Sequence, residues 1–182
     1  AAPSMRSSCP YVHALCLATW QWYDVKTTGR SPAPRSGHQS VAVEDNLYVM
    51  GGWNASQQFD DLHILDGTTL TWSQPTVGSD DGIGSWGPQR WNFSAVSVFA
   101  VPHRKIFVFG GNSGELDASN PLGKYLNDVQ VLECVDRSAI DGGDVAAAAA
   151  AAELQWTHPA VVDGADGRPS PRASSQMFYS TG

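Results

Sequence analysis

Two pairs of adjacent polar side chains are the first candidates for chemistry in this sequence. Asp60-Asp61 and Asn127-Asp128 each precede a short run of alternating apolar residues. Two carboxylates held close together can act as general acid and base. Because the two pairs occupy equivalent places in two similar stretches of sequence, we interpret them as structural, with short polar side chains that hold a turn.

Other candidate catalytic and metal-binding residues lack the spacing that their chemistry requires. The five histidines are scattered, and the three cysteines do not have the spacing of metal ligands. The glycine-rich stretch at residues 82–87 lacks the lysine and helix of a phosphate-binding loop. The sequence therefore predicts no catalytic residue, no cofactor and no metal site. The residues weighed are His13, His38, His63, His103, His158, Cys9, Cys16 and Cys134.

Composition limits the classes of partner. The 182 residues are 42% hydrophobic and carry a formal net charge of −7. An acidic chain without a cluster of lysine and arginine does not favour nucleic acid, and no apolar run approaches the roughly 18–20 residues that cross a bilayer. Neither a signal peptide nor paired cysteines are apparent. We expect other proteins as partners, no nucleic acid, no membrane, and a cytoplasmic location.

A motif recurs along the chain with 55 residues between Arg35 and Arg90. Each copy has an arginine, alternating apolar residues, an apolar run ending in Gly-Gly, an acidic pair and a tryptophan. Residues 12–22 match the end of the motif, and a third copy begins at Arg172. The motif residues are Arg35, Gly51, Gly52, Asp61 and Trp72 in one copy and Arg90, Gly110, Gly111, Asp128 and Trp156 in the next.

Each copy predicts four short β-strands. Alternation at Val41/Val43 and the apolar run at 106–109 are typical of strands. The Gly-Gly pairs allow positive φ and close backbone approach. No stretch outside the alanine-rich insertion has helical periodicity, so the fold class expected is all-β.

This order of features resembles the Kelch repeat. The resemblance implies a partial Kelch-type β-propeller with four-stranded antiparallel blades around a central channel. We expect residues 1–30 to be the tail of a preceding blade, 31–87 one blade, 88–168 a second blade, and 169–182 the start of another. With this period the segment does not close a ring alone.

The recurrent residues have expected structural roles. The tryptophans Trp22, Trp72 and Trp156 should pack between blades. The arginines should donate to backbone carbonyls or to the acidic pair.

Segments that differ between the copies are the candidates for binding, because loops carry function on a rigid scaffold. An insertion near 133–153 contains the alanine run 146–152, which we interpret as a disordered excursion or, alternatively, a short helix that docks a partner. The possible partner-binding loop residues are Trp53, Asn54, Asp81, Trp86, Glu115 and Asp117.

The resemblance implies a non-catalytic protein-interaction scaffold within a larger protein, and not an enzyme. One alternative is a propeller attached to an enzyme or motor elsewhere in the chain. Another is a galactose-oxidase-like enzyme, but the cysteines stand beside no suitable set of copper ligands. The second copy, with VPHRKIFVFGG, is also similar to blades of ciliary proteins, including an algal outer-arm dynein heavy chain, which adds the ciliary axoneme as a location.

Overall fold

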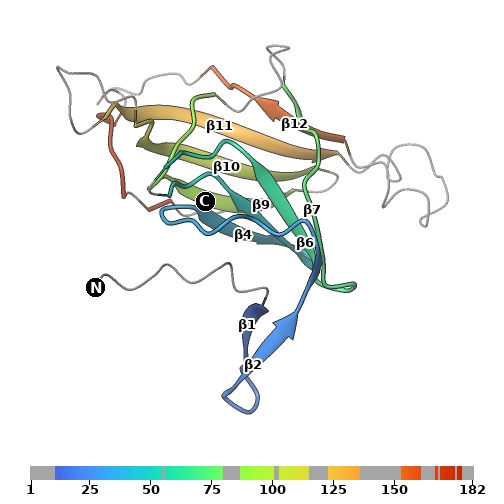
Figure 1. Cartoon of the computed structure of the whole chain (residues 1–182). Helices are drawn as coiled ribbons and strands as arrows, with labels where there is room; N and C mark the ends of the chain where they lie inside the picture. Colours follow the sequence, from blue (N-terminus) through green and yellow to red (C-terminus); the bar gives the residue numbers. More distant parts are fainter. Residues whose placement is uncertain are drawn as a thin grey trace, which may run out of the picture.

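The computed structural model shows a chain built from β-strands in all of its described parts, so the all-β prediction is confirmed. The model describes residues 11–54, 56–79, 87–100, 103–114, 123–135, 153–160, 167, 169–174 and 176–177. These residues form one hairpin and two larger sheets, arranged in succession (Figure 1).

The hairpin lies at the N-terminal end of the described chain. Strands β1 (Tyr11–Cys16) and β2 (Gln21–Lys26) pair antiparallel and project away from the two sheets (Figure 1). Their turn repeats the turn that joins the last two long strands of the first sheet. The Trp20 amide donates to Cys16 O at 2.7 Å, and the Leu70 amide donates to Asp66 O at 2.8 Å. This equivalence supports the match between residues 12–22 and the end of the motif.

The first sheet follows the hairpin and has the strand order β3-β7-β6-β5-β4. Its four longer strands pair antiparallel, and the two-residue strand β3 runs parallel to β7 at its edge. The strands are β3 (Thr28–Gly29), β4 (Gln39–Val43), β5 (Asn46–Met50), β6 (Leu62–Asp66) and β7 (Thr71–Ser73).

The second sheet repeats this arrangement in the order β8-β12-β11-β10-β9. Its four longer strands are antiparallel, as the four-stranded blade requires, and β8 runs parallel to β12. The short strands β3 and β8 were not predicted, because two residues carry no periodic signal. The strands are β8 (Gly78–Ser79), β9 (Ser94–Ala100), β10 (His103–Asn112), β11 (Tyr125–Val135) and β12 (Glu153–Thr157).

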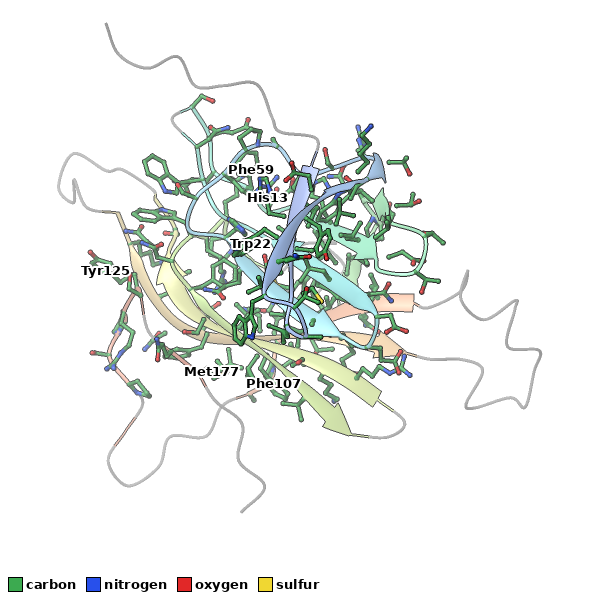
Figure 2. The ribbon with its side chains drawn as sticks, turned by 90° about the horizontal axis from the view of Figure 1, so that it is seen from below. His13, Trp22, Phe59, Phe107, Tyr125 and Met177 are labelled. Atoms are coloured by element: carbon green, nitrogen blue, oxygen red, sulfur yellow. The ribbon has the colours of Figure 1, made fainter. Side chains whose placement is uncertain are left out.

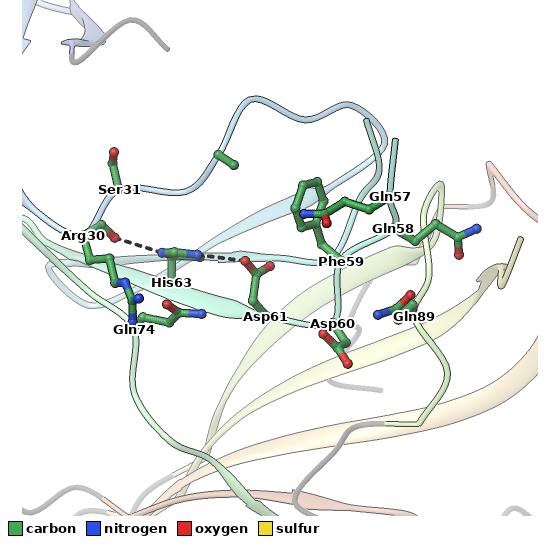
Figure 3. A pocket seen from close by; sticks show the side chains of 11 residues that line it. Arg30, Ser31, Gln57, Gln58, Phe59, Asp60, Asp61, His63, Gln74 and Gln89 are labelled. Carbon is green, nitrogen blue, oxygen red and sulfur yellow. Dashed lines mark hydrogen bonds and ion pairs between the residues drawn. The ribbon is translucent and has the colours of Figure 1, made fainter. Parts of the chain in front are cut away.

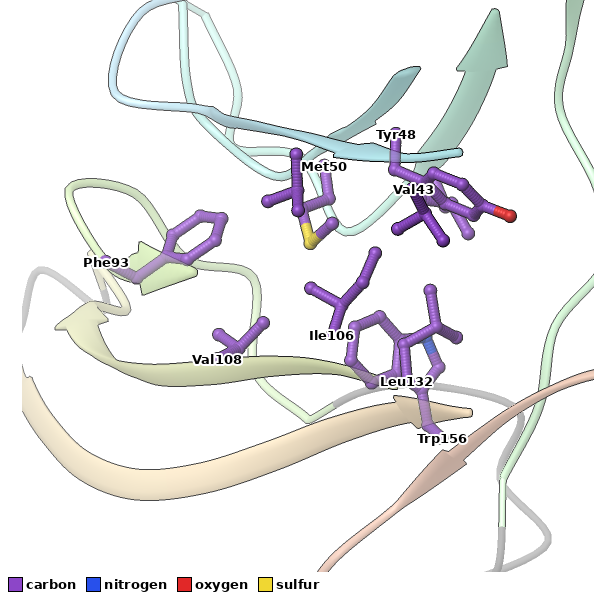
Figure 4. Packing of buried hydrophobic residues seen from close by; sticks show 10 residues of the cluster. Val43, Tyr48, Met50, Phe93, Ile106, Val108, Leu132 and Trp156 are labelled. Atoms are coloured by element: carbon purple, nitrogen blue, oxygen red, sulfur yellow. The ribbon is translucent and has the colours of Figure 1, made fainter. Parts of the chain in front are cut away.

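The main hydrophobic core lies between the two sheets. Met50 from β5 and Ile106 and Val108 from β10 have no exposed surface, and Val41 and Val43 of β4 are also buried. Figure 4 shows these side chains meeting between the ribbons of the two sheets. Burial of this apolar surface holds the two repeats together face to face.

Two of the three recurrent tryptophans pack toward the preceding unit. Trp156 is 2% exposed and joins the core shared with the first sheet. Trp72 packs with Val49 and Leu65, and Val12 of the hairpin lies against that cluster. The prediction of packing between blades is therefore confirmed for these two residues.

Trp22 does not follow that prediction. Its side chain is 69% exposed on β2. By the rule that the other two tryptophans follow, Trp22 would pack on a sheet preceding the hairpin, and the described residues form no sheet there.

Candidate functional site

The arginine and the second acidic residue of the first copy form a bidentate ion pair. Arg35 Nη2 donates to Asp61 Oδ2 at 2.9 Å, and its Nη1 donates both to Asp61 Oδ1 and, at 3.0 Å, to the carbonyl of Gly51. The guanidinium carbon also lies 3.9 Å from the centre of the Phe59 ring, a cation–π contact. Only 3% of the Arg35 side chain is exposed. The charged groups are therefore engaged with each other and not with solvent.

The second copy repeats the pair. Arg90 Nη1 and Nη2 donate to the two oxygens of Asp128 at 2.9 and 2.7 Å, and Nη1 also donates to the carbonyl of Gly110 at 3.1 Å. The Arg90 side chain is fully buried. Both partners expected for these arginines, a backbone carbonyl and the acidic pair, are present in both sheets. We call each pair an arginine–aspartate latch.

The latches hold their carboxylates in the ionised form. Burial raises the pKa of Asp61, but the hydrogen bonds from Arg35 and His63 outweigh it and hold that pKa well below its usual range. Burial also raises the pKa of Asp128, and the bonds and charge of Arg90 lower it by more. A carboxyl that stays ionised is a poor general acid, which agrees with a structural role for both aspartates.

A second side chain completes each latch and differs between the sheets. In the first, His63 Nε2 lies 2.9 Å from Asp61 Oδ2 and its Nδ1 lies 2.9 Å from the carbonyl oxygen of Arg30. Through these two contacts the histidine connects the Arg30 carbonyl, in the segment before Arg35, to the latch. In the second sheet, Gln130 takes this place and its Nε2 donates to Asp128 Oδ2 at 2.8 Å.

The first Gly-Gly pair directly follows β5, and the second lies within β10. Atoms of neighbouring segments come close to both pairs. All four glycines have positive φ, from 60° to 100°. A Cβ on Gly52 would lie 2.9 Å from Ser36 O, and one on Gly111 would lie 2.8 Å from the Cβ of Phe93. The sequence prediction of positive φ and close approach is confirmed at these positions.

Successive repeats are also joined by recurrent backbone hydrogen bonds. The Asn92 amide donates to Gly37 O at 2.8 Å, and the Ser174 amide donates to Asn92 O at 2.7 Å. All three residues stand two positions after a motif arginine and have positive φ, between 52° and 65°. The same geometry therefore recurs at two junctions between repeats, which we call the first junction (at Asn92) and the second junction (at Ser174).

The loop after β5 brings an aromatic side chain to the surface. Trp53 is 40% exposed, and its ring centre lies 5.4 Å from that of Trp91, at an interplanar angle of 39°. Asn54 has a local role in addition to any contact with a partner, because its Oδ1 accepts hydrogen bonds from the amides of Ser56 and Gln57. The turn at residues 54–57 follows Trp53, which lies at the end of the first sheet where Gly51 and Gly52 follow β5.

A polar hollow of about 410 Å³ opens beside the first latch. Figure 3 shows the row of Arg30, His63 and Asp61 on one side of the hollow, with Gln58 and Gln89 on the other. Glutamine amides both donate and accept hydrogen bonds, so this lining suits a polar chain such as a peptide backbone. The residues come from the segment between β3 and β4, from the loop before β6 and β6 itself, and from the link to the second sheet.

Four of the expected loop residues lie outside the described residues. They are Asp81, Trp86, Glu115 and Asp117, as are residues 136–152 of the insertion near 133–153. The sequence did not indicate Gln58 and Gln89, which line the hollow beside the first latch. Nor did it indicate Trp91, which contacts Trp53, or Tyr125, which is 42% exposed. Trp91 had a usable signal, since it follows directly after the motif arginine.

Two kinds of site are absent from the described parts of the chain. No three histidine, cysteine, aspartate or glutamate side chains there are placed to hold a metal ion. No helix in those parts has the length and apolar character to span a membrane.

Comparison with known proteins agrees with the repeated sheets. The profile of the KLHDC2/KLHL20/DRC7 Kelch-repeats domain matches residues 4–138. The chain is 28% identical over 142 residues to Kelch domain-containing protein 3 of Homo sapiens, covering 74% of this chain and 34% of that protein. It is 34% identical over 97 residues to the Rab9 effector protein with kelch motifs of Xenopus laevis, covering 51% of this chain and 24% of that protein.

A further relative is a flagellar dynein chain. The chain is 29% identical over 123 residues to the dynein alpha chain of the flagellar outer arm of Chlamydomonas reinhardtii, covering 63% of this chain and 2% of that protein. The chain thus spans between 2% and 34% of the length of these three relatives. The profile match covers more than half of the chain, and the chain forms two sheets of the same strand order, each with its own arginine–aspartate latch. The chain therefore belongs to the Kelch-repeat domain family.

Proposed function

We propose that this chain is a non-catalytic protein-interaction module, a segment of a Kelch β-propeller that serves as a scaffold in a larger protein. The observation that carries the proposal is that the candidate catalytic carboxylates are engaged in ion pairs within the fold. Both conspicuous carboxylates, Asp61 and Asp128, are held ionised by a buried arginine of their own repeat. Repetition of one arrangement in two sheets favours architecture over chemistry.

The proposed partner surface is formed by the loops at the end of the sheets where the Gly-Gly pairs lie, and we call it the loop face. This loop face carries the exposed Trp53 and the polar hollow lined by Gln58 and Gln89. Aromatic side chains near a pocket are typical of residues that dominate binding energy at protein interfaces. A rigid stack of sheets positions these loops with little ordering cost on binding.

Photo-crosslinking tests this proposal. A benzoylphenylalanine at Gln58 on the loop face should yield a discrete adduct with a partner protein in the source cell. The same group at Thr19, in the exposed turn of the hairpin, is the matched control and should yield no such adduct. Equal adducts from both positions, or none from Gln58, would oppose a loop-face interaction. A metal or redox absorption band in the purified protein would favour the galactose-oxidase-like alternative instead.

A second proposal concerns the parent protein. Similarity to the flagellar outer-arm dynein alpha chain supports a propeller attached to a motor and a location in the ciliary axoneme. Immunolocalisation of the full-length protein tests this, with axonemal staining as the expected result. A purely nuclear or secreted signal would reject the axonemal location and leave the interaction proposal standing.

A further inference from the structure

The loop face brings two features together at the first junction. One is the polar hollow beside the first latch, and the other is the pair of indole rings of Trp53 and Trp91. Trp53 pairs with Gln58 in an antiparallel bridge, and Gln58 lines the hollow. Because paired residues of an antiparallel ladder carry their side chains on the same face, the indole pair and the hollow are neighbouring parts of one surface.

Glutamine side chains supply the hydrogen-bonding groups of the hollow that the fold does not use. Each side-chain amide has two N–H donors and one acceptor oxygen. Within the described part of the chain, none of the four glutamine amides makes a hydrogen bond. Three of the side chains are exposed, and the fourth, Gln58, is half-buried and lies against Gly114 of the second repeat. The four are Gln57, Gln58, Gln74 and Gln89.

The charged side chains of the hollow give it no predominant sign. Asp61 is engaged by Arg35 and His63 in the first latch. Arg30 and Asp60 also line the hollow, and their charges are opposite. A strongly acidic or basic guest would therefore be attracted by one of these two residues and repelled by the other. The lining favours a guest without a high net charge.

The backbone beside the hollow does not offer amides for strand addition. The four successive amides of residues 51–54 donate to backbone carbonyls within the fold, those of Asp61, Arg90, Ser36 and Gln57 in that order. A guest that adds a strand needs unpaired backbone groups on its host. Recognition at this surface therefore depends on side chains, which are the glutamine amides and the indoles.

A proline-rich segment fits a surface of this kind. Proline has no backbone N–H, so a run of prolines offers carbonyl acceptors and needs no partner for backbone donors. Such a run forms a polyproline II helix, which has no internal hydrogen bonds and is extended before it binds. Aromatic side chains are the usual docking surface for this helix, because the pyrrolidine rings pack against them. The indoles can take the rings, and the glutamine amides can donate to the carbonyls.

From these observations we infer that the hollow and the indole pair bind a proline-rich segment of the partner protein in the polyproline II conformation. A prolyl ring would pack on Trp53, which is 40% exposed, and Gln89 would donate to a prolyl carbonyl. Tyr125 is also exposed but lies at the outer edge of the molecule in Figure 2, away from Phe59 of the hollow, so it is not part of this site. The inference rests on the proposed function and names the chemical class of the partner segment.

The direct test uses a small probe on the full chain labelled with 5-fluorotryptophan. Acetyl-hexaproline-amide should shift the Trp53 fluorine signal, assigned with Trp53→Phe, in a saturable manner. A serine–glycine hexapeptide of alternating sequence has backbone N–H groups throughout and should not produce this shift. No saturable shift with hexaproline, or an equal shift with the serine–glycine peptide, would overturn the inference. A larger shift with hexaglutamate would also overturn it, because charge would then determine binding.

Variants separate the two parts of the site, with anisotropy of a dye-labelled hexaproline as the measurement. Trp53→Ala should weaken probe binding at least 10-fold, whereas Trp20→Ala removes a 73% exposed indole from the hairpin turn and should leave binding unchanged. Gln89→Leu keeps the size of the side chain but removes its amide, and should weaken binding at least 5-fold. It provides a second test if Trp53→Ala fails to fold, with Gln21→Leu on the hairpin as its control. A variant that binds as tightly as its control would contradict the role given to that residue.

Competition separates this inference from the proposed function. If a partner crosslinks at Gln58, hexaproline in excess should displace that partner from the wild-type chain, and the serine–glycine peptide should not. A partner that hexaproline does not displace would reject the proline-rich segment and leave the interaction module intact. Saturable hexaproline binding without any protein adduct at Gln58 would oppose the proposed function and leave a binding site for polyproline II helices.

Discussion

The two sheets of this chain have the same latch and strand order but differ at the positions around them. In both, an arginine donates to the carbonyl of the first glycine of the Gly-Gly pair and to an aspartate. This aspartate stands directly before the third long strand in the first sheet and near the start of that strand in the second. In the first sheet the latch is completed by His63 and Phe59, and the junction beyond it is filled by two indoles. In the second sheet Gln130 completes the latch, and Asn112 and Ala173 stand at the positions of the two indoles. The shared parts specify the fold, and the differing parts are where binding can vary.

The largest expected effect comes from breaking a latch. Arg90→Ala leaves the Asp128 charge without its partner in a partly buried site and should lower the free energy of unfolding by about 3–5 kcal/mol. Chemical denaturation of the full chain measures this. Arg172→Ala is the control, because Arg172 is exposed and its side-chain hydrogen bonds within the described part of the chain go to Ser170, so it should cost about 0.5 kcal/mol or less. Equal losses for the two variants would show that burial of the latch is unimportant.

The next effect separates backbone strain from steric clash at the Gly-Gly pair. Gly111→Ala meets both positive φ and atoms of Trp91 and Phe93 within 3.0 Å, and should cost about 1–3 kcal/mol for strain plus a similar amount for crowding. Gly167 also has positive φ but nothing within 4 Å of its Cβ position, so Gly167→Ala isolates the strain. Thermal melts of the two variants measure the difference. Valine at Gly51 or Gly110 should prevent the blade from folding, because both residues have positive φ near 60°. A melt of Gly111→Ala no lower than that of Gly167→Ala would contradict close packing at the pair.

An intermediate effect is expected from acid. The pKa of Asp61 in the folded chain lies below its ordinary value of about 3.9. A depressed pKa contributes stability that is present above the unfolded pKa and is lost as pH falls through the folded one. Stability of the first sheet should therefore decline progressively below about pH 4, measured by denaturation at a series of pH values. Asp61→Asn removes the titrating group and should flatten this part of the profile, and an unchanged profile would assign the acid sensitivity to other carboxyls.

The smallest effect tests the difference between the latches directly. His63→Gln places the residue of the second sheet in the first. The glutamine can still donate to Asp61 but should lose the bond to Arg30 O, at a cost of about 1 kcal/mol. Denaturation measures the loss, and the exchange rate of amides in β3 should rise because the incoming segment is less firmly held. A loss above about 3 kcal/mol would mean that histidine has a larger role than one extra hydrogen bond.

Much of the fold could be predicted from the sequence because the same residue types recur in the same order in both copies of the repeat. The strand at residues 46–50 was recognisable because Tyr48, Val49 and Met50 form an apolar run before two glycines, and all three are buried. The ion pairs were predictable as one of two options, since an arginine and an aspartate recur in step. Repetition converts weak local signals into a consistent pattern.

The parts that sequence did not predict depend on contacts distant along the chain. β8 consists of two residues, and only its pairing with β12, some 75 residues later, makes it a strand. Trp22 matches Trp72 in the repeat but is exposed, because its environment depends on a neighbouring sheet and not on its own strand. The ring contact between Trp53 and Trp91 joins residues 38 positions apart, and the equivalent residues Asn112 and Ala173 carry no ring, so the repeat alone did not predict it.

Hydrogen exchange at the junction amides tests the central claim most directly, that successive repeats are separate sheets joined by a recurrent set of backbone bonds. The amides of Gly52 and Asn92 donate across the first junction to Arg90 O and Gly37 O. We expect both to be protected to a degree similar to amides inside β10, and far more than those of the hairpin turn at residues 17–20. Exchange of Gly52 and Asn92 as fast as that turn would contradict the account, because the two repeats would then not be held in the arrangement described.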